Sequence, residues 1–337
     1  MTAQPDKRAD LVLEGGGVKG IGLVGAILVL TDAGFTFPRV AGTSAGAIVA
    51  SLLAALQAAG QPPSRLRSYM EQIDYGQFER KDPLQRLNGR LGDVVHLVRH
   101  MGLHDGDYLI EWLGGVLDQI GITTFRQLRI SDSEDSGTAL PEGCRYRLVV
   151  HTADITRGKL VRLPWDYPDY GVAPDDQRIV DAVRASMSTP IFFDPVRFAA
   201  QAASVDGVDC PAGTVTWVDG GLLSNFPVEV FDRGDGQPER WQTIGVKLSA
   251  RQTAFPPPRP VRNILEELRG CLKALLANAD RYYVDPAKAA RTIFVDAGAV
   301  KATDFHLTPD QRQMLFQNGQ RAAQEYLAAA AARPSPA

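Results

Sequence analysis

The sequence predicts an α/β domain built on a central, mainly parallel β-sheet. Two observations predict it: short runs rich in β-branched residues alternate with longer helical patterns, and 45% of the 337 residues are hydrophobic, enough for a sizeable core. Such alternation is typical of parallel sheets whose faces are covered by helices. We expect a flexible N-terminus over residues 1–8, a single domain over 9–332 and a disordered tail over 333–337.

The expected elements follow in order along the chain. Short β-branched runs predict the strands Leu11–Leu13, Arg39–Ala41, Tyr146–His151, Val215–Val218, Thr243–Leu248 and Thr292–Val295. Apolar periodicity predicts the helices Val18–Thr31, Ala45–Ala59, Asp107–Ile120, Arg178–Ala185, Val261–Ala279 and Pro309–Ala332. Segment 61–107 is less regular, and we interpret it as a helical insertion packed on the sheet, with a mobile lid over a lipid site as the alternative.

Composition and charge exclude several classes of protein. The net charge is −3, so no basic excess is available to neutralise nucleic-acid phosphates. The three cysteines are widely spaced and show no metal-ligand spacing, which is typical of a reducing compartment. The N-terminus lacks the apolar core of a secretory signal, and the longest apolar run, Ile21–Leu30, is far shorter than the roughly 20 residues that span a bilayer. We expect a cytoplasmic protein with no metal and no cofactor.

A glycine-rich turn follows the first predicted strand. Gly15, Gly17 and Gly20 match the pattern G-x-G-x-x-G, which also occurs in dinucleotide-binding domains. A dinucleotide site would need an acidic residue about 20 residues later to bind the ribose hydroxyl. Val40 stands there instead. A nucleotide-binding module therefore stays an alternative, although the carboxylate that would bind the ribose hydroxyl is missing from the expected position.

A G-x-S-x-G sequence follows the second predicted strand and begins a helical pattern. In this context Ser44 is the candidate nucleophile of a tight strand-to-helix turn, in which only glycine fits at Gly42 and Gly46. The alternative is that Ser44 only caps the helix.

A nucleophile and an oxyanion-binding turn are the two parts that acyl transfer needs together. We expect the backbone N–H groups of Gly15, Gly16 and Gly17 to bind the oxyanion of a tetrahedral intermediate. Lys19 either adds positive charge nearby or is a solvated helix side chain.

Two residues are candidates for the base. His306 falls late enough in the chain to complete a Ser-Asp-His triad of the α/β-hydrolase type. Asp219, with Gly220 and Gly221 behind it, directly follows the strand Val215–Val218, which places a carboxylate at the same sheet edge as the nucleophile. This segment alone favours a plain Asp-Gly turn at Asp219.

Three of these motifs together resemble the patatin-like phospholipase family. They occur in the family's order, as GGGVKG (Gly15–Gly20), GTSAG (Gly42–Gly46) and DGG (Asp219–Gly221). Weaker likenesses support the resemblance, which covers about Ala9–Val230. They are GLHDGDYLIEWL (Gly102–Leu113), HTADITRGKLVRLP (His151–Pro164) and RASMSTPIFFDPV (Arg184–Val196).

The resemblance implies a three-layer α/β/α fold and hydrolysis of lipid acyl esters, of the phospholipase A or lysophospholipase type. It implies a catalytic dyad in which Ser44 is the nucleophile and Asp219 its direct base. A buried Asp219 needs a raised pKa to act as a base, and shielding at the sheet edge would raise it. We expect a lipid or lysolipid substrate and transient peripheral membrane contact through apolar residues of 61–101 or the loop Phe255–Pro260. A catalytically inactive patatin-like scaffold is a further alternative.

Overall fold

The computed structural model describes residues 7–79, 104, 106–131, 140–205, 207–237, 239–248, 260–262, 266–267, 270–271, 274 and 286–332. The terminal segments 1–6 and 333–337, the loop residues 255–259 and most of the predicted helix Val261–Ala279 lie outside these residues, as do positions 80–103 of the predicted insertion.

A mixed, mostly parallel sheet forms the centre of the domain. Its strand order is β11-β10-β1-β3-β4-β9-β6, and β2 and β5 pair with β1 and β4 respectively. The strands β11, β10, β1, β3 and β4 run parallel to one another, whereas β5 and β9 pair antiparallel with β4, and β6 pairs antiparallel with β9. The bounds are β1 Lys7–Leu13, β2 Phe35–Thr36, β3 Val40–Thr43, β4 Leu148–Asp154, β5 Lys159–Leu163, β6 Val196–Ala200, β9 Gly213–Asp219, β10 Gln242–Lys247 and β11 Thr292–Phe294.

Five of the six predicted helices lie close to their expected positions. The helices are α1 Ile21–Asp32, α2 Ala45–Ala58, α3 Arg65–Gln72, α5 Asp107–Ile120, α6 Ile179–Ser186, α8 Pro286–Ala290 and α9 Pro309–Ala331. Of these, α3 falls in the predicted helical insertion and α8 was not predicted. Short 3-10 helices add η1 Gly17–Gly20, η2 Tyr75–Glu79, η3 Phe125–Leu128, η4 Glu142–Cys144, η5 Tyr167–Tyr170 and η6 Gly220–Leu222, and β7 Ala203–Val205 pairs with β8 Val208–Cys210 as a hairpin. Among the residues described, no helix has both the length and the apolar character to cross a bilayer. The α/β fold with a mainly parallel sheet flanked by helices is confirmed.

The two faces of the sheet bury different cores, because successive side chains of a strand point to opposite faces. Leu11 and Leu13 of β1 belong to the main core, together with α1, α2 and α6. Val12, between them, belongs to a smaller core with Ala41 and Phe231. Every residue of α2 from Ala45 to Leu56 is buried, so this helix lies wholly inside the domain.

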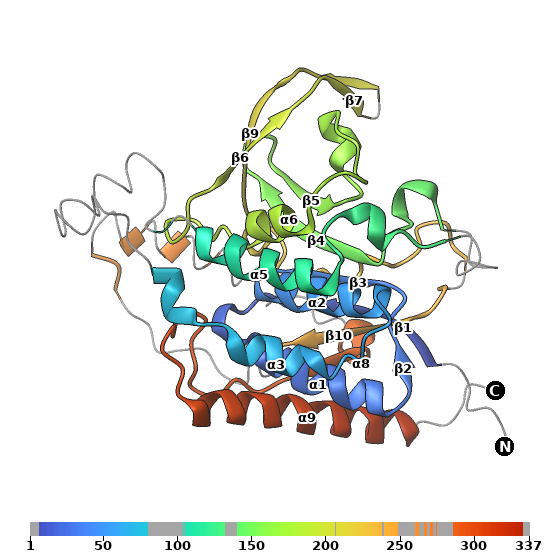
Figure 1. Cartoon of the computed structure of the whole chain (residues 1–337), viewed down its shortest axis with the longest axis vertical. Helices are drawn as coiled ribbons and strands as arrows, with labels where there is room; N and C mark the ends of the chain where they lie inside the picture. Colours follow the sequence, from blue (N-terminus) through green and yellow to red (C-terminus); the bar gives the residue numbers. More distant parts are fainter. Residues whose placement is uncertain are drawn as a thin grey trace.

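The last helix packs directly on the first. Figure 1 shows α9 along the lower edge of the view, beside α1 and α3. Gly25 and Gly319 permit this approach, since a Cβ atom on Gly25 would lie 2.1 Å from the Phe316 carbonyl oxygen and one on Gly319 would lie 2.0 Å from the Gly22 carbonyl oxygen. The described part of the predicted insertion, residues 61–79, packs on α1 and α2 through α3, rather than on the sheet.

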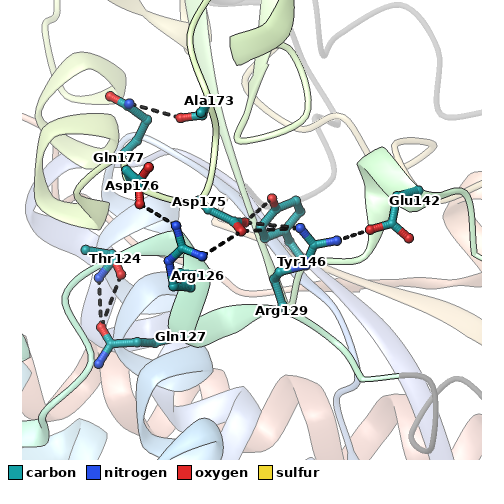
Figure 2. A network of polar contacts seen from close by, with 10 residues as sticks. All are labelled: Thr124, Arg126, Gln127, Arg129, Glu142, Tyr146, Ala173, Asp175, Asp176 and Gln177. Carbon is teal, nitrogen blue, oxygen red and sulfur yellow. Dashed lines mark hydrogen bonds and ion pairs between the residues drawn. The ribbon is translucent and has the colours of Figure 1, made fainter.

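A polar network joins η3 to the segment that precedes α6 (Figure 2). The Arg129 guanidinium and the Tyr146 hydroxyl both donate to the Asp175 carboxylate, at 3.3 and 2.6 Å. Arg126 donates to Asp176 at 2.5 Å. These contacts hold the start of α6 against the body of the domain, and the C-terminal end of α6 reaches the candidate site.

Candidate active site

Ser44 lies at the tight turn between β3 and α2. Its backbone has φ +52° and ψ −124°, a conformation that side-chain-bearing residues rarely adopt and that is found mainly at functional sites. A Cβ atom on Gly42 would lie 2.3 Å from the Gly46 carbonyl oxygen, and one on Gly46 would lie 2.4 Å from the Leu13 carbonyl oxygen. The prediction that only glycine fits at both flanking positions is confirmed.

The environment of Ser44 argues against a capping role. Its side chain makes no capping hydrogen bond to α2. Its N–H donates to the Ser186 hydroxyl at 2.8 Å, and that hydroxyl donates in turn to the His151 carbonyl at 2.6 Å. The Ser44 Oγ atom lies 3.5 Å from the sulfur of Met187. The backbone of the turn is therefore fixed by the hydrogen bond to Ser186, and the Ser44 hydroxyl lies at the wall of a cavity.

The glycine turn after β1 lies directly against Ser44. A Cβ atom on Gly15 would be 3.1 Å from the Ser44 Cβ atom and 2.1 Å from the Asn225 side-chain oxygen. Asn225 fixes the turn from the opposite side, because its carbonyl accepts the Gly15 N–H at 3.1 Å and its side-chain amide donates to the Gly15 carbonyl at 3.0 Å.

These contacts correct one part of the sequence prediction. The Gly15 N–H carries a single proton and already donates it to Asn225, so it is not available to an oxyanion. The N–H groups of Gly16 and Gly17 have no hydrogen-bond acceptor within the described part of the chain. Gly17 has φ +57°, and a Cβ atom there would lie 1.9 Å from the Ala302 carbonyl oxygen.

Of the two interpretations of Lys19, the structure disfavours a solvated side chain. Lys19 is half-buried, its ammonium donates to the Leu248 carbonyl at 3.4 Å, and burial lowers the pKa of its side chain. Positive charge near the glycine turn stays a prediction, since a Cβ atom on Gly16 would lie 3.4 Å from the Lys19 Cε atom. Lys19 is not among the residues that line the cavity. A Cβ atom on Gly20 would lie 3.0 Å from the terminal methyl of Met70, so Gly20 serves close packing of η1.

Asp219 lies at the same end of the sheet, but it arrives there from the opposite direction. Strand β4 extends past the end of β3, since His151 pairs with Thr43 and Thr152 pairs with Asp219. Strand β9 pairs antiparallel with this extension and ends where the parallel strands end. Figure 1 shows β6, β7 and β9 together at the top of the view, away from α9. The predicted position of the carboxylate is therefore right, although the strand that carries it is antiparallel.

The Asp219 carboxyl is buried and well supplied with hydrogen bonds. One oxygen accepts the Thr189 hydroxyl at 2.7 Å, and the other accepts the Gly221 N–H at 2.8 Å. Burial raises the pKa of Asp219, whereas the bonds from Gly221 and Thr189, and a smaller contribution from the Ser44 side chain, lower it. The expected direction of the pKa shift agrees with this result. A Cβ atom on Gly220 would lie 2.5 Å from the His151 carbonyl oxygen, so the turn behind Asp219 is as tight as the one at Ser44.

Ser44, Asp219 and the glycine turn line one cavity of about 480 Å³. The rest of its wall is mainly apolar. Aromatic rings dominate, with Phe192 stacked on Phe305 at 5.1 Å between centroids and Phe78 edge-on to Phe193 at 6.0 Å. The lining residues are Gly15, Gly16, Gly17, Val18, Ser44, Ile48, Tyr75, Phe78, Met187, Thr189, Pro190, Ile191, Phe192, Phe193, Asp219, Gly221, Asn225, Ala302, Thr303 and Phe305.

The alternative base, His306, lies elsewhere. His306 is exposed and does not line the cavity. His151 is fully buried on β4 behind Ser44, where burial lowers its pKa to about 4. Neither histidine is placed to accept a proton from the Ser44 hydroxyl in the manner of a triad.

Sequence reasoning assigned no role to three residues that support the site. Ser186 holds the Ser44 N–H, Thr189 holds the Asp219 carboxyl and Asn225 holds Gly15. Ser186 and Thr189 lie in the hydroxyl-rich stretch RASMSTP, between an amphipathic helix and an aromatic run. This run of small hydroxyl side chains before a proline was the sequence signal that could have indicated their role.

Comparisons with known proteins identify the family to which the chain belongs. A family model described as patatin-like phospholipase matches residues 11–232, which include the glycine turn, Ser44 and Asp219. The chain is similar to YqhO of Bacillus subtilis strain 168, an uncharacterised protein, with 34% identity over 321 residues, covering 94% of this chain and 97% of that protein.

Two solved structures resemble the chain at a lower level. VipD from Legionella pneumophila has 19% identity and a TM-score of 0.49, with 96% of this chain and 67% of that chain covered. Full-length ExoU, solved with SpcU from the type III secretion system of Pseudomonas aeruginosa, has 18% identity and a TM-score of 0.46, with 97% of this chain and 53% of that chain covered. The chain thus spans about half the length of ExoU.

Proposed function

Because the chain belongs to the patatin-like phospholipase family, we propose that it is a serine acyl hydrolase that cleaves lipid acyl esters, as a phospholipase A or lysophospholipase does. The observation that carries the proposal is that Ser44, in its strained turn, and the buried Asp219 carboxyl face one largely apolar cavity.

In this proposal the Ser44 hydroxyl attacks the carbonyl carbon of the ester, and Asp219 accepts its proton directly. Burial supports Asp219 in this role, since an ordinary carboxylate with a pKa near 3.9 is a weak base toward an alcohol. Asp219 then returns the proton to the departing alcohol or lysolipid, which leaves an acyl-enzyme on Ser44. Water then attacks the acyl-enzyme while Asp219 accepts its proton, and Asp219 returns that proton to the Ser44 oxygen as the fatty acid leaves.

The negative charge that develops on the carbonyl oxygen needs hydrogen-bond donors. We assign this role to the N–H groups of Gly16 and Gly17, and withdraw Gly15 because its N–H donates to Asn225. The N-terminus of α2, which begins directly after Ser44, adds a favourable dipole.

The apolar wall of the cavity suits an acyl chain. The Phe78, Phe192, Phe193 and Phe305 rings offer contact surface along which methylene groups would leave water. Access to such a substrate would require transient contact with a lipid surface, and the segments suggested for that contact, 61–101 and 255–260, lie mostly outside the described residues.

The test is hydrolysis of mixed phospholipid and lysophospholipid vesicles, with the products identified by mass spectrometry. Ser44→Ala and Asp219→Asn should each lower the rate at least 10³-fold, on the order expected for loss of a reacting group. Ser51→Ala is the matched control, because Ser51 is a buried serine of α2, the helix that begins directly after Ser44, and its hydroxyl donates to the Ile48 carbonyl.

A fluorophosphonate probe gives a second readout. It should label the wild type and Ser51→Ala but not Ser44→Ala. His306→Ala should retain full activity, and a loss as large as that of Asp219→Asn would replace the dyad by a triad. Activity that survives Ser44→Ala would refute the proposal.

A further inference from the structure

Thr189 opens a strained turn at the wall of the cavity. The Phe192 and Phe193 N–H groups both donate to the Thr189 carbonyl, at 3.1 and 2.9 Å, which closes the turn over Pro190 and Ile191. Ile191 has φ +72° at the third position of this turn, where glycine or asparagine is usual. A β-branched residue in this conformation is strained, so the surrounding contacts must hold the turn in place.

The turn and the residue before it hold Asp219 at two points. The Asp219 N–H donates to the Ser188 carbonyl at 2.9 Å, and the Thr189 hydroxyl donates to the Asp219 carboxyl at 2.7 Å. The backbone and the side chain of Asp219 are thus both bound by the same short segment. Gly221 binds the other carboxyl oxygen, so the plane of the carboxyl is fixed from both sides.

We propose that Thr189 is a positioning residue for Asp219: its hydroxyl binds one carboxyl oxygen and fixes the orientation of the carboxyl toward Ser44. This inference rests on the proposed function of the same site. Thr189 belongs to the cavity wall, but its effect on the reaction is exerted through the carboxyl that it binds.

Other charged groups near Asp219 do not take over this role. The elements packed against it carry His151 and Asp154 on β4, Asp181 and Arg184 on α6 and Arg197 on β6. The Arg184 guanidinium donates to the Ser188 hydroxyl and to the Asp194 carbonyl. The pKa of Asp219 is set by burial and by hydrogen bonds from Gly221, Thr189 and Ser44, with no contribution from these charged side chains. Loss of the Thr189 donor should therefore raise this pKa further.

The experiment compares the pH dependence of kcat/KM for Thr189→Val, which keeps the shape but loses the hydroxyl, with Thr189→Ser, which keeps the hydroxyl. In Thr189→Val the acid limb of the profile should move to higher pH by about one unit, which lowers the rate on that limb about tenfold. Thr189→Ser should return the limb to its wild-type position. Rates are normalised to the fraction of enzyme labelled by the fluorophosphonate probe, so that a loss of folded protein does not affect the comparison of kcat/KM between the variants.

Thr152→Val is the control for a purely structural threonine. Thr152 pairs with Asp219 in the sheet, and its hydroxyl donates to the Val218 carbonyl at 2.6 Å, not to the carboxyl. This variant should keep the acid limb in place even if its stability falls. An unmoved limb in Thr189→Val, or an equal displacement in Thr189→Ser, would overturn the inference. Failure of the proposed function itself is distinguishable, because the wild type would then show no hydrolysis that depends on Ser44.

Discussion

Replacement of His151 by asparagine should remove a pH-dependent part of the stability of the domain. His151 is fully buried, and its Nε2 atom has no hydrogen-bond partner within the described residues. Its Nδ1 atom lies 3.4 Å from the Gly42 carbonyl oxygen, a contact that an asparagine amide can imitate. Because burial disfavours the imidazolium, the folded protein holds the pKa of this group at about 4, against 6.5 for an exposed histidine.

The size of the effect on the free energy of unfolding follows from this pKa difference. The unfolded chain binds a proton at His151 more readily than the folded chain, so the stability due to the neutral ring is complete above pH 6.5 and is lost as the pH falls toward 4. At about 1.36 kcal/mol per pKa unit, the full effect is about 3 kcal/mol.

Asp10 opposes this trend in the wild type. Burial raises the pKa of Asp10 from 3.8 to about 6 despite its ion pair with Arg39. Its contribution to the free energy of unfolding is therefore complete below pH 3.8 and is lost as the pH rises through 6. The two effects have similar size and opposite sign, and Asp219, whose pKa burial also raises, acts in the same direction as Asp10, so the pH profile of the wild type alone does not report His151. The difference between wild type and variant isolates His151.

The assay is urea unfolding followed by circular dichroism at pH 4.5, 5.5, 6.5 and 7.5. The free energy of unfolding of the wild type minus that of His151→Asn should increase by about 2.5 kcal/mol from the lowest to the highest pH. A difference that stays constant across this range would show that His151 does not titrate as a buried neutral ring, and would refute the reasoning.

Three further predictions concern stability. Ser186→Ala leaves two buried backbone groups without a partner and should lower the free energy of unfolding by about 2 kcal/mol in urea titrations, with esterase activity reduced as well. Gly46→Ala should cost at least about 3 kcal/mol because its Cβ atom would collide with a β1 carbonyl, whereas Gly114→Ala, with no atom within 4 Å, should gain about 0.5–1 kcal/mol; equal thermal shifts would contradict this contrast. Arg126→Ala removes an ion pair with the exposed Asp176 and a longer one, at 3.5 Å, with Asp175. Because the Arg126 side chain is exposed, the change in stability should be less than about 1 kcal/mol by the same titration.

The sequence predicted the helices better than it predicted the sheet. Helix α9 matches its expected range closely because Thr308 and Gln311 form a capping box at its start and its periodicity is long. Strand direction is not encoded in a short apolar run, so the antiparallel course of β9 could not be anticipated. The short strands β6, β7 and β8 carry too few buried residues to give a periodic signal.

The site was predictable to the extent that short motifs carry it. Ser44 was proposed from its local turn sequence and Asp219 from the three motifs taken together, and the structure brings both to one cavity. Gly15 was misassigned because its N–H donates to Asn225, which lies 210 positions later in the chain. Thr189 was missed for the same reason: its partner is a side chain from a distant strand, and local patterns do not report such contacts.

The antiparallel pairing of β9 with the extension of β4 has a consequence for length variation in this protein. The distance between Ser44 and Asp219 is set by strand pairing, because Thr43 pairs with His151 and the next residue of β4, Thr152, pairs with Asp219. It does not depend on the length of the loops that join these strands. Insertions in the β7–β8 hairpin should therefore leave the reacting pair aligned. A single residue deleted within Gly213–Asp219 would turn the carboxyl to the opposite face of the sheet and separate it from the serine.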